Sequence, residues 1–428
     1  MEIVLMLLIL MVILIMINVP ISYSIGIVSI SYFFIKDISL LTIPQRMFST
    51  INTSTLFAIP LFLLAGMLMN KAEVTDKLYH LAFTLIGHIR GGLAHVNVLS
   101  SMMFASMTGS AMADIVGLGT VSATAMEKKG FKKTFAAAVS LSASTITPII
   151  PPSIILIVYG VVAEVSIGRL FLAGILPGLA IGLILMLYIY LASFKKDFPR
   201  EKSRASFGAV VTAFRHAILP LFMPVIILGG ILLGIFTPTE AGAVAVLYVL
   251  IIGFLVYKKL TVKIVIETLK EVAATSSVIL LLISISGILG WIITIEQVPV
   301  LLTDSLLSLT SNPIIILLLI NVIILIAGMF LDATPIVLML VPVFMPILLN
   351  IGVDPVHFGI IIGVNTMIGV TTPPVGAGLY AISGALKINV MDVIKEMLPM
   401  WGALFVVLLI ITFWPGLSLT IPNLIFGK

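Results

Sequence analysis

Long runs of apolar residues, separated by short clusters of charged residues, form the main pattern along this chain. A helix that crosses a membrane needs about 20 consecutive, predominantly apolar residues. The sequence lacks the alternation of apolar and polar positions that marks the strands of a membrane barrel. The pattern therefore predicts an all-α polytopic membrane protein, with crossings near residues 133–163, 169–193, 216–236, 239–257, 274–295, 355–386 and 401–416.

Composition leads to the same fold class. Of 428 residues, 61% are hydrophobic and only 10% are charged, whereas an ordinary soluble domain carries about 25% charged residues. So few charges cannot cover the surface of a soluble globule, which excludes a soluble enzyme, a disordered chain and a coiled coil. The chain has no cysteine, so disulfide bonds and thiolate metal sites are ruled out.

The first 50 residues are ambiguous at the sequence level. No basic residue precedes the apolar stretch that follows Met1, so we expect a retained span rather than a cleaved signal peptide. Asn18-Val19-Pro20 is a candidate break that would divide this stretch into two pieces.

Lysine and arginine gather in clusters, and the positive-inside rule places such clusters on the cytoplasmic side. No Lys or Arg occurs between Glu271 and Leu386, so the loops around Glu296 and Asp304 are predicted to lie on the outer face. The three clusters are Lys128, Lys129, Lys132 and Lys133; Lys195, Lys196, Arg200, Lys202 and Arg204; and Lys258, Lys259, Lys263 and Lys270.

Two apolar stretches do not fit single crossings. Residues 92–127 have basic groups at both ends, Arg90 and Lys128, whereas residues 313–350 have none at either end. Each stretch is about as long as two half-spans. We therefore predict two re-entrant hairpins, the first entering from the cytoplasm and the second from outside.

The two halves of the sequence share a set of anchors. Thr147-Pro148 recurs as Thr372-Pro373 and Leu176-Pro177 as Leu398-Pro399, at offsets of 225 and 222. Asp114 and Asp332 add a third pair at an offset of 218. The repeat and the charge pattern together predict two inverted repeats, an architecture that in transporters places the binding site at the bilayer midplane. The first repeat is 1–204, with N-terminal scaffold helices, hairpin 92–127 and broken helix 131–163; the second is 205–428, with scaffold helices, hairpin 313–350 and broken helix 355–386.

Each predicted repeat contains two interruptions at membrane depth. Proline removes a backbone donor and prevents a continuous helix, and non-helical backbone at that depth must be buried in protein or face a watery cavity. Freed carbonyls and hydroxyls suit Na⁺, while the amino ends of the following half-helices suit a carboxylate. Those half-helices are expected to begin near Asp114, Ser153, Pro335 and Gly376. The interruptions are SMTGS at 106–110, TPIIPPS at 147–153, residues 328–335, and GVTTPPVG at 369–376.

Asp114 and Asp332 are intramembrane acids at positions that the repeat matches, and a direct role in Na⁺ binding or coupling is their functional interpretation. The alternative is that each acid caps the second helix of its hairpin or shields the nearby N–H groups. The hydroxyls near the breaks either join the same sites or bond back to helix carbonyls. They belong to Thr108, Ser110, Ser144, Thr145, Thr147, Thr334, Thr371 and Thr372.

Other polar residues receive structural interpretations. Glu240 follows Thr237-Pro238-Thr239 and is predicted to complete a capping box. The five histidines are scattered near span ends, and no His-Glu-x-x-His motif occurs. We therefore expect no metal other than Na⁺, no organic cofactor, no catalytic residue and no nucleic-acid partner.

The motifs around the first two breaks resemble a known family. IPLFLLAG at 59–66, GGLAH at 91–95, SMTGSAMAD at 106–114 and TPIIPPS at 147–153 are similar to the large membrane (M) subunit of tripartite ATP-independent periplasmic (TRAP) transporters. The similarity runs along essentially the whole chain. The hairpin tip reads Thr108-Gly109-Ser110, where the family often has Ser-Gly-Ser, so the hydroxyl is kept.

The resemblance implies an elevator-type permease with a scaffold and a moving transport domain, in the bacterial inner membrane. It implies Na⁺-coupled import of a small organic acid of the sialic acid or C4-dicarboxylate type. It also implies two partners, a small four-helix membrane subunit and a periplasmic binding protein. The family's Na⁺ sites fall here on Thr108, Ser110, Asp114, Thr147, Pro148, Gly328, Asp332, Thr334, Gly369, Thr371 and Thr372. The substrate is expected at Ser110, Ser153, Pro152, Thr334, Pro374 and Gly376.

Three alternative functions stay open at this point. A stand-alone Na⁺/carboxylate symporter would need the same site but no binding protein. An intramembrane protease could use Asp114 and Asp332 as catalytic acids, although each acid lies beside Gly and Ser or Thr in a hairpin tip. A passive channel would show flux without Na⁺ dependence, whereas inverted repeats favour alternating access.

Overall fold

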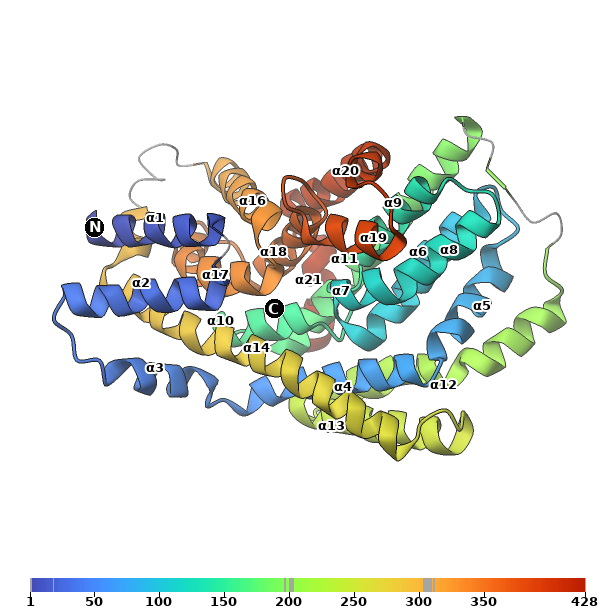
Figure 1. The fold of residues 1–428 in the computed structure, drawn as a ribbon, viewed down its shortest axis with the longest axis horizontal. Helices are drawn as coiled ribbons and strands as arrows, with labels where there is room; N and C mark the ends of the chain where they lie inside the picture. The colour runs from blue at the N-terminus through green and yellow to red at the C-terminus, as the bar shows by residue number, and fades with distance from the viewer. Residues whose placement is uncertain are drawn as a thin grey trace.

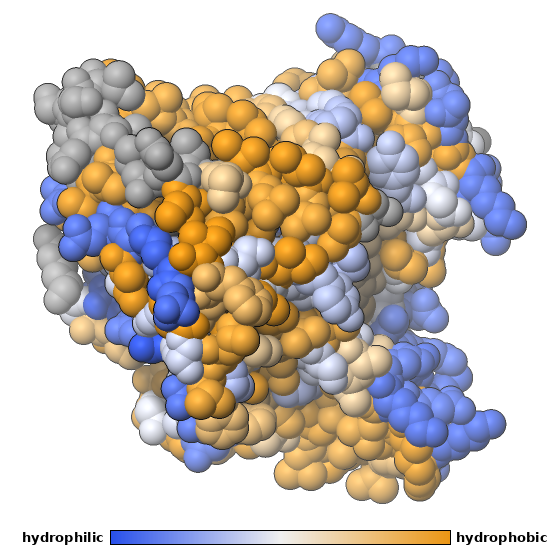
Figure 2. Space-filling model, turned by 60° about the vertical axis from the view of Figure 1, so that its left-hand side comes forward, coloured by the Kyte–Doolittle hydropathy of each residue, from blue (hydrophilic) through white to orange (hydrophobic). Residues whose placement is uncertain are grey.

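The fold is helical throughout the part of the chain that the computed structural model describes (Figure 1). Eight helices among these residues are long and apolar enough to cross a membrane, which confirms the predicted all-α polytopic class. Hydrophobic residues cover the middle of the face in Figure 2, and hydrophilic residues gather toward its left and right margins. The described residues are 2–17, 19–195, 198–199, 204–302, 310 and 312–427.

The N-terminal apolar run is divided into two short helices. Helices α1 (Glu2–Met16) and α2 (Ile21–Ile35) pack against each other and lie side by side in Figure 1. Pro20 stands just before α2, while Asn18 of the predicted break lies outside the described residues. The chain then continues through α3 (Thr42–Ile51), a 3₁₀ turn (Ser54–Phe57), α4 (Ala58–Lys71) and α5 (Val74–Ile86).

Helix α11 (Ile167–Lys195) ends the predicted first repeat. The helices at the predicted scaffold positions of the second repeat are α12 (Phe207–Leu232), α13 (Pro238–Ile251) with a π-helical turn (Ile252–Val256), and α14 (Val262–Ile295). The predicted capping box of α13 is confirmed, because Thr237 and Glu240 satisfy each other's backbone N–H groups. Helix α14 begins at Val262 rather than near 274, since Thr261 caps it and no breaker follows. Lys196, Arg200, Lys202 and Asp304 lie outside the described residues.

Each predicted hairpin stretch contains two helical arms joined by a turn of two residues. In the first, α6 (Gly92–Thr108) ends at Gly109, whose φ of 58° only glycine adopts without cost. Its return arm consists of α7 (Ala111–Asp114), a π-helical turn (Ile115–Gly119) and α8 (Thr120–Lys128). In the second, α16 (Pro313–Phe330) turns through Leu331 and Asp332 into α17 (Ala333–Asn350).

Each hairpin is followed by a pair of helices with a break between them. The first pair is α9 (Lys133–Ser144) and α10 (Ile154–Val162), and the second is α18 (Pro355–Val370) and α19 (Ala377–Leu386). Helices α20 (Val390–Phe413) and α21 (Gly416–Phe426) close the chain. Every residue of α18 beyond Pro355 is buried, so this helix lies in the core of the protein.

Backbone and side-chain details recur between the two halves at a nearly constant spacing. Among the described non-glycine residues, those with positive φ form the pairs Asp37 and Lys258, Glu73 and Gln297, and Glu164 and Lys387, spaced 221, 224 and 223 residues apart. Such backbone is rare outside glycine. In addition, Asn97 donates to Ser140 at 2.6 Å in the first half, and Asn365 donates to Asn321 at 2.7 Å in the second. These spacings favour two repeats, and their inverted orientation and their boundaries stay predictions.

The predicted sidedness can be tested with single cysteines, because the chain contains none. Lys128 ends α8 in a basic cluster and Glu164 precedes α11, and both side chains are exposed. In sealed spheroplasts we expect a membrane-impermeant maleimide to label Glu164→Cys but not Lys128→Cys. Labelling of Lys128→Cys should appear only after the membrane is opened. Labelling of Lys128→Cys in sealed cells would show that the positive-inside assignment is wrong.

Candidate functional site

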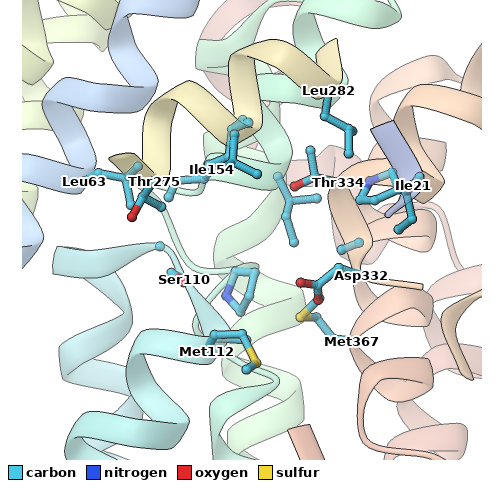
Figure 3. A pocket seen from close by; sticks show the side chains of 18 of the residues that line it. Ile21, Leu63, Ser110, Met112, Ile154, Thr275, Leu282, Asp332, Thr334 and Met367 are labelled. Carbon is cyan, nitrogen blue, oxygen red and sulfur yellow. The ribbon is translucent and has the colours of Figure 1, made fainter. Parts of the chain in front are cut away.

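A cavity of about 600 Å³ lies between the two hairpin tips and the scaffold helices. In Figure 3, Ser110 reaches it from one side, while Asp332 and Thr334 point toward it from the other. Thr275 and Leu282 of α14 line it as well, so the cavity separates the hairpins from a long scaffold helix. It is large enough for a small organic molecule.

The cavity contains a carboxylate but no basic side chain among its described lining residues. Asp332 occupies the N-cap position of α17, yet its side chain makes no capping hydrogen bond. The carboxylate is exposed at the cavity, and its one hydrogen-bond contact among the described residues is with the backbone N–H of Ala333. The nearby polar groups are the hydroxyls of Ser22, Ser110, Thr275 and Thr334. An anionic ligand here would depend on hydroxyls, helix amino ends or a bound cation.

Asp114 has a different environment from Asp332. Its side chain is completely buried and does not line the cavity. Thr147 of the first break donates a hydrogen bond of 2.7 Å to Oδ2 of Asp114. The other oxygen, Oδ1, makes no hydrogen bond of ordinary geometry, and the Ser101 hydroxyl lies close to the same carboxylate. The pair Asp114–Thr147 thus joins the first hairpin to the first broken helix.

The expected match between Asp114 and Asp332 is wrong in detail. Ser110, not Asp114, is the N-cap of the first return arm, and its Oγ accepts from the N–H of Ala113. The residue that corresponds to Asp332 is therefore Ser110, at a spacing of 222. The half-helices begin at Ala111 and Ala333, before the expected starts near Asp114 and Pro335. The left-handed Gly109 sets this register, because it ends α6 before the acid is reached.

Several hydroxyls at the breaks bond back to backbone carbonyls, as the structural alternative proposed. Those of Thr371 and Thr372 both donate to Ile368 O, at 2.8 and 2.7 Å. Ser144 and Thr145 likewise donate to carbonyls three residues earlier. Thr108 differs, because its hydroxyl is buried without a hydrogen-bond partner. Ser153 caps α10 and also donates to Pro148 O.

The hairpin tips touch the breaks through glycine backbone. A Cβ built on Gly109 would lie 2.5 Å from the carbonyl oxygen of Pro152, and one built on Gly369 would lie 2.5 Å from Cα of Gly328. The N–H of Gly376 also donates to Met329 O at 3.0 Å. Each hairpin therefore packs against its own broken helix with no side chain between them.

The structure brings together part of the predicted site. Ser110, Pro148, Asp332 and Thr334 line the cavity, whereas Pro152, Ser153, Pro374 and Gly376 do not. Thr108, Asp114, Thr147, Gly328, Gly369, Thr371 and Thr372 lie behind the lining, within the hairpins and the breaks.

Sequence reasoning missed the scaffold side of the cavity. Pro20, Ile21 and Ser22, at the turn between α1 and α2, line it together with Thr275. The interruption Asn18-Val19-Pro20 was visible as a break, but its spatial partner was not. No local pattern linked it to hairpin tips nearly 100 and over 300 residues away.

Comparisons with known proteins agree on one family. The profile described as "Tripartite ATP-independent periplasmic transporter, DctM component" matches residues 8–417. The sialic acid TRAP transporter large permease protein SiaM of Vibrio cholerae is 39% identical over 414 residues, covering 96% of each chain. The C4-dicarboxylate TRAP transporter large permease protein DctM of the same organism is 37% identical, covering 96% of this chain and 95% of the relative.

Among solved structures, the YdaH transporter of Alcanivorax borkumensis superposes with a TM-score of 0.56 at 16% sequence identity, covering 87% of this chain and 88% of YdaH. That likeness concerns the fold alone.

The close approach of Gly328 and Gly369 yields a testable prediction. A methyl group at residue 369 would meet Gly328 backbone, so Gly369→Ala should destabilise the protein by about 1–3 kcal/mol and impair transport. Gly384→Ala in α19 is the matched control, because nothing lies within 4 Å of its Cβ position. Thermal unfolding in detergent and uptake should be measured for both variants. Equal behaviour of the two would show that the backbone contact is dispensable.

Proposed function

The chain belongs to the DctM family of TRAP large permeases, and from this premise we propose that it is the Na⁺-coupled permease of a three-component importer for a small organic acid. As a member of this family it is a multi-pass protein of the bacterial inner membrane and a transporter rather than an enzyme. The observation that carries the proposal is the cavity at the hairpin tips, where the described lining residues include Asp332 and several hydroxyls but no basic side chain.

The proposed substrate class follows from the relatives and from the cavity. SiaM and DctM are named for sialic acid and C4-dicarboxylates, which share a carboxylate. A substrate carboxylate beside Asp332 would be repelled by its like charge. Na⁺ bound by Asp332 removes that repulsion, and the amino end of α17, beginning at Ala333, then favours the anion. Substrate binding thus depends on Na⁺, which is the physical basis of coupling.

We place a second proposed cation position around Asp114. Hard cations prefer oxygen ligands, and Asp114 Oδ1 is buried without a hydrogen-bond partner. Ser101 and Thr108 also have buried, unpartnered hydroxyls. They are seven residues apart on α6, so they share one face of that helix.

We further propose an elevator mechanism in which the hairpins and broken helices move against the scaffold. A direct backbone contact of the two parts supports a sliding surface there. A Cβ on Gly66 of α4 would lie 2.8 Å from Met107 O and 2.9 Å from Thr108 Cα at the first hairpin tip. The partners in this proposal are a small membrane subunit and a periplasmic binding protein that delivers the substrate.

Substitutions of Asp332 and Asp114 test the proposed cation roles of these two acids. Asp332→Asn removes the charge that faces the cavity, so Na⁺-dependent uptake should fall by a factor within the usual range of coupling, about 5–150-fold. Asp114→Asn should also weaken Na⁺ dependence, while Thr147 can still donate to the amide oxygen. Uptake at graded Na⁺ concentrations and thermal unfolding of each variant are the measurements. If both variants kept normal Na⁺ dependence and folding, the proposed cation role of these acids would be wrong.

Reconstitution tests the three-component arrangement. We expect uptake into liposomes to require this chain, its small partner, a loaded binding protein and an inward Na⁺ gradient. Sialic acid and succinate should be offered separately, so that the result also selects the substrate. Uptake of free acid without a binding protein would contradict the proposal and favour a stand-alone Na⁺/carboxylate symporter.

A further inference from the structure

Two elbows connect the long scaffold helices to the segments that lead into the hairpin stretches. The first lies between α4 and α5, where Glu73 has a φ of 57°, and α5 then packs against α6. The second follows α14, where Gln297 has a φ of 53° before helix resumes at Val298. Left-handed backbone in a non-glycine residue is uncommon, and here it occurs at both equivalent bends.

A carboxylate at each elbow forms an ion pair with a lysine from the other half of the chain. Glu296 Oε1 lies 2.7 Å from Lys36 Nζ, and Glu73 Oε2 lies 2.7 Å from Lys259 Nζ. Lys36 follows α2, which packs on α14, and Lys259 follows α13, which packs on α4. The two glutamates are 223 residues apart, and so are the two lysines. One ion pair is therefore the counterpart of the other.

The two pairs differ in their surroundings. Tyr32 donates a second hydrogen bond of 2.7 Å to Glu296 Oε1. The hydrogen bond from Lys36, and next the one from Tyr32, hold the pKa of Glu296 below its ordinary value, so the carboxylate is ionised at neutral pH. Glu296 is 13% exposed, whereas Glu73 is 55% exposed. Water and salt screen an exposed pair more strongly.

Further contacts hold the first elbow. Lys71 pairs with Glu271 at 3.6 Å, and the Lys77 ammonium lies 3.0 Å from the ring centroid of Tyr257. None of these groups lines the cavity. Because Lys259 belongs to a basic cluster and Glu296 to the stretch without cations, the two elbows are expected on opposite membrane faces.

We propose that the ion pairs Glu73–Lys259 and Lys36–Glu296 are pins, meaning fixed contacts that hold the two elbows to the scaffold. The connecting arms, which are α5 and the helix that resumes at Val298, then pivot at Glu73 and Gln297 while the hairpins move. This inference rests on the proposed elevator mechanism. The four charged side chains are positioning residues, since they act on the geometry of the arms and not on the substrate. A fixed pivot converts hairpin displacement into rotation about one residue instead of deformation of the whole scaffold.

Charge removal and charge exchange test the pins. Uptake should be measured in liposomes with both partners, for Lys36→Gln, Glu296→Gln and the exchanged double variant Lys36→Glu with Glu296→Lys. We expect the single variants to lower the maximal rate about threefold to tenfold, with an unchanged half-saturating concentration of loaded binding protein. The exchanged pair should recover most of the rate. The corresponding variants of Glu73 and Lys259 should show a smaller loss, because that pair is more exposed.

The matched control is the exposed pair Lys395–Asp392, which lies 3.1 Å apart on α20. Lys395→Gln should leave the rate unchanged. Single pin variants that transport at the normal rate would overturn the proposal. It would also be overturned if the exchanged double variant unfolded at the normal temperature but did not recover the transport rate.

A second measurement covers the case in which the exchanged pair does not fold. Cysteines can replace Lys36 and Glu296 in a chain that has none, and a short bifunctional thiol reagent can then join them. A fixed pin predicts that cross-linking restores the rate lost on substitution. Cross-linking that stops transport would show that the contact opens in the cycle, which overturns the proposal. Uptake by the unmodified protein with and without a Na⁺ gradient tests Na⁺ coupling separately. If that uptake did not depend on Na⁺, the transport rates of the variants could still be compared with one another.

Discussion

This structure depends on one constraint, which is that backbone N–H and C=O groups freed at helix breaks inside the membrane need hydrogen-bond partners. Lipid offers no hydrogen bonds, so a broken helix at membrane depth must be covered by protein or water. Here each hairpin tip covers its own break through glycine backbone, at Gly109 against Pro152 and at Gly328 against Gly369. A side chain at those points would separate the two parts. The breaks, the tips and the cavity beside them therefore form one unit.

The same unit explains why the cavity can suit an anion without a basic side chain. Breaking a helix creates a free amino end, and the first turn of α17 supplies one beside Asp332. A lysine at that depth would be costly unless paired, and it would bind the anion regardless of Na⁺. Under the proposed Na⁺ coupling, a carboxylate open to the cavity would make anion binding conditional on a cation. The buried Asp114 does not line the cavity, so under the proposal it acts on a cation and on Thr147 rather than on the substrate directly.

Much of this arrangement could be predicted from the sequence, and the rest fails for identifiable reasons. Apolar runs and the proline pairs at 151–152 and 373–374 were enough to locate the membrane helices and the breaks. These signals did not locate the turn of the first hairpin, because Gly109 and Ser110 end α6 and start α7 before Asp114 is reached. The turn at Pro20 was visible as an interruption, yet its place in the cavity depends on packing against α14.

The ion pairs at the elbows show a different limit of sequence reasoning. Each of Lys36, Glu73, Lys259 and Glu296 reads as an ordinary charge near a span end, and only the fold reveals that they pair across the two halves. On the proposed inverted arrangement, equivalent elbows on opposite faces would give the inward and outward states similar free energies, which alternating access requires. Differences between the halves then determine how ligands bias those states. The clearest is at the hairpin cap, where the first half has the neutral Ser110 and the second has Asp332. A cation bound at one cap but not at its counterpart is a differential interaction of the kind that can shift such an equilibrium.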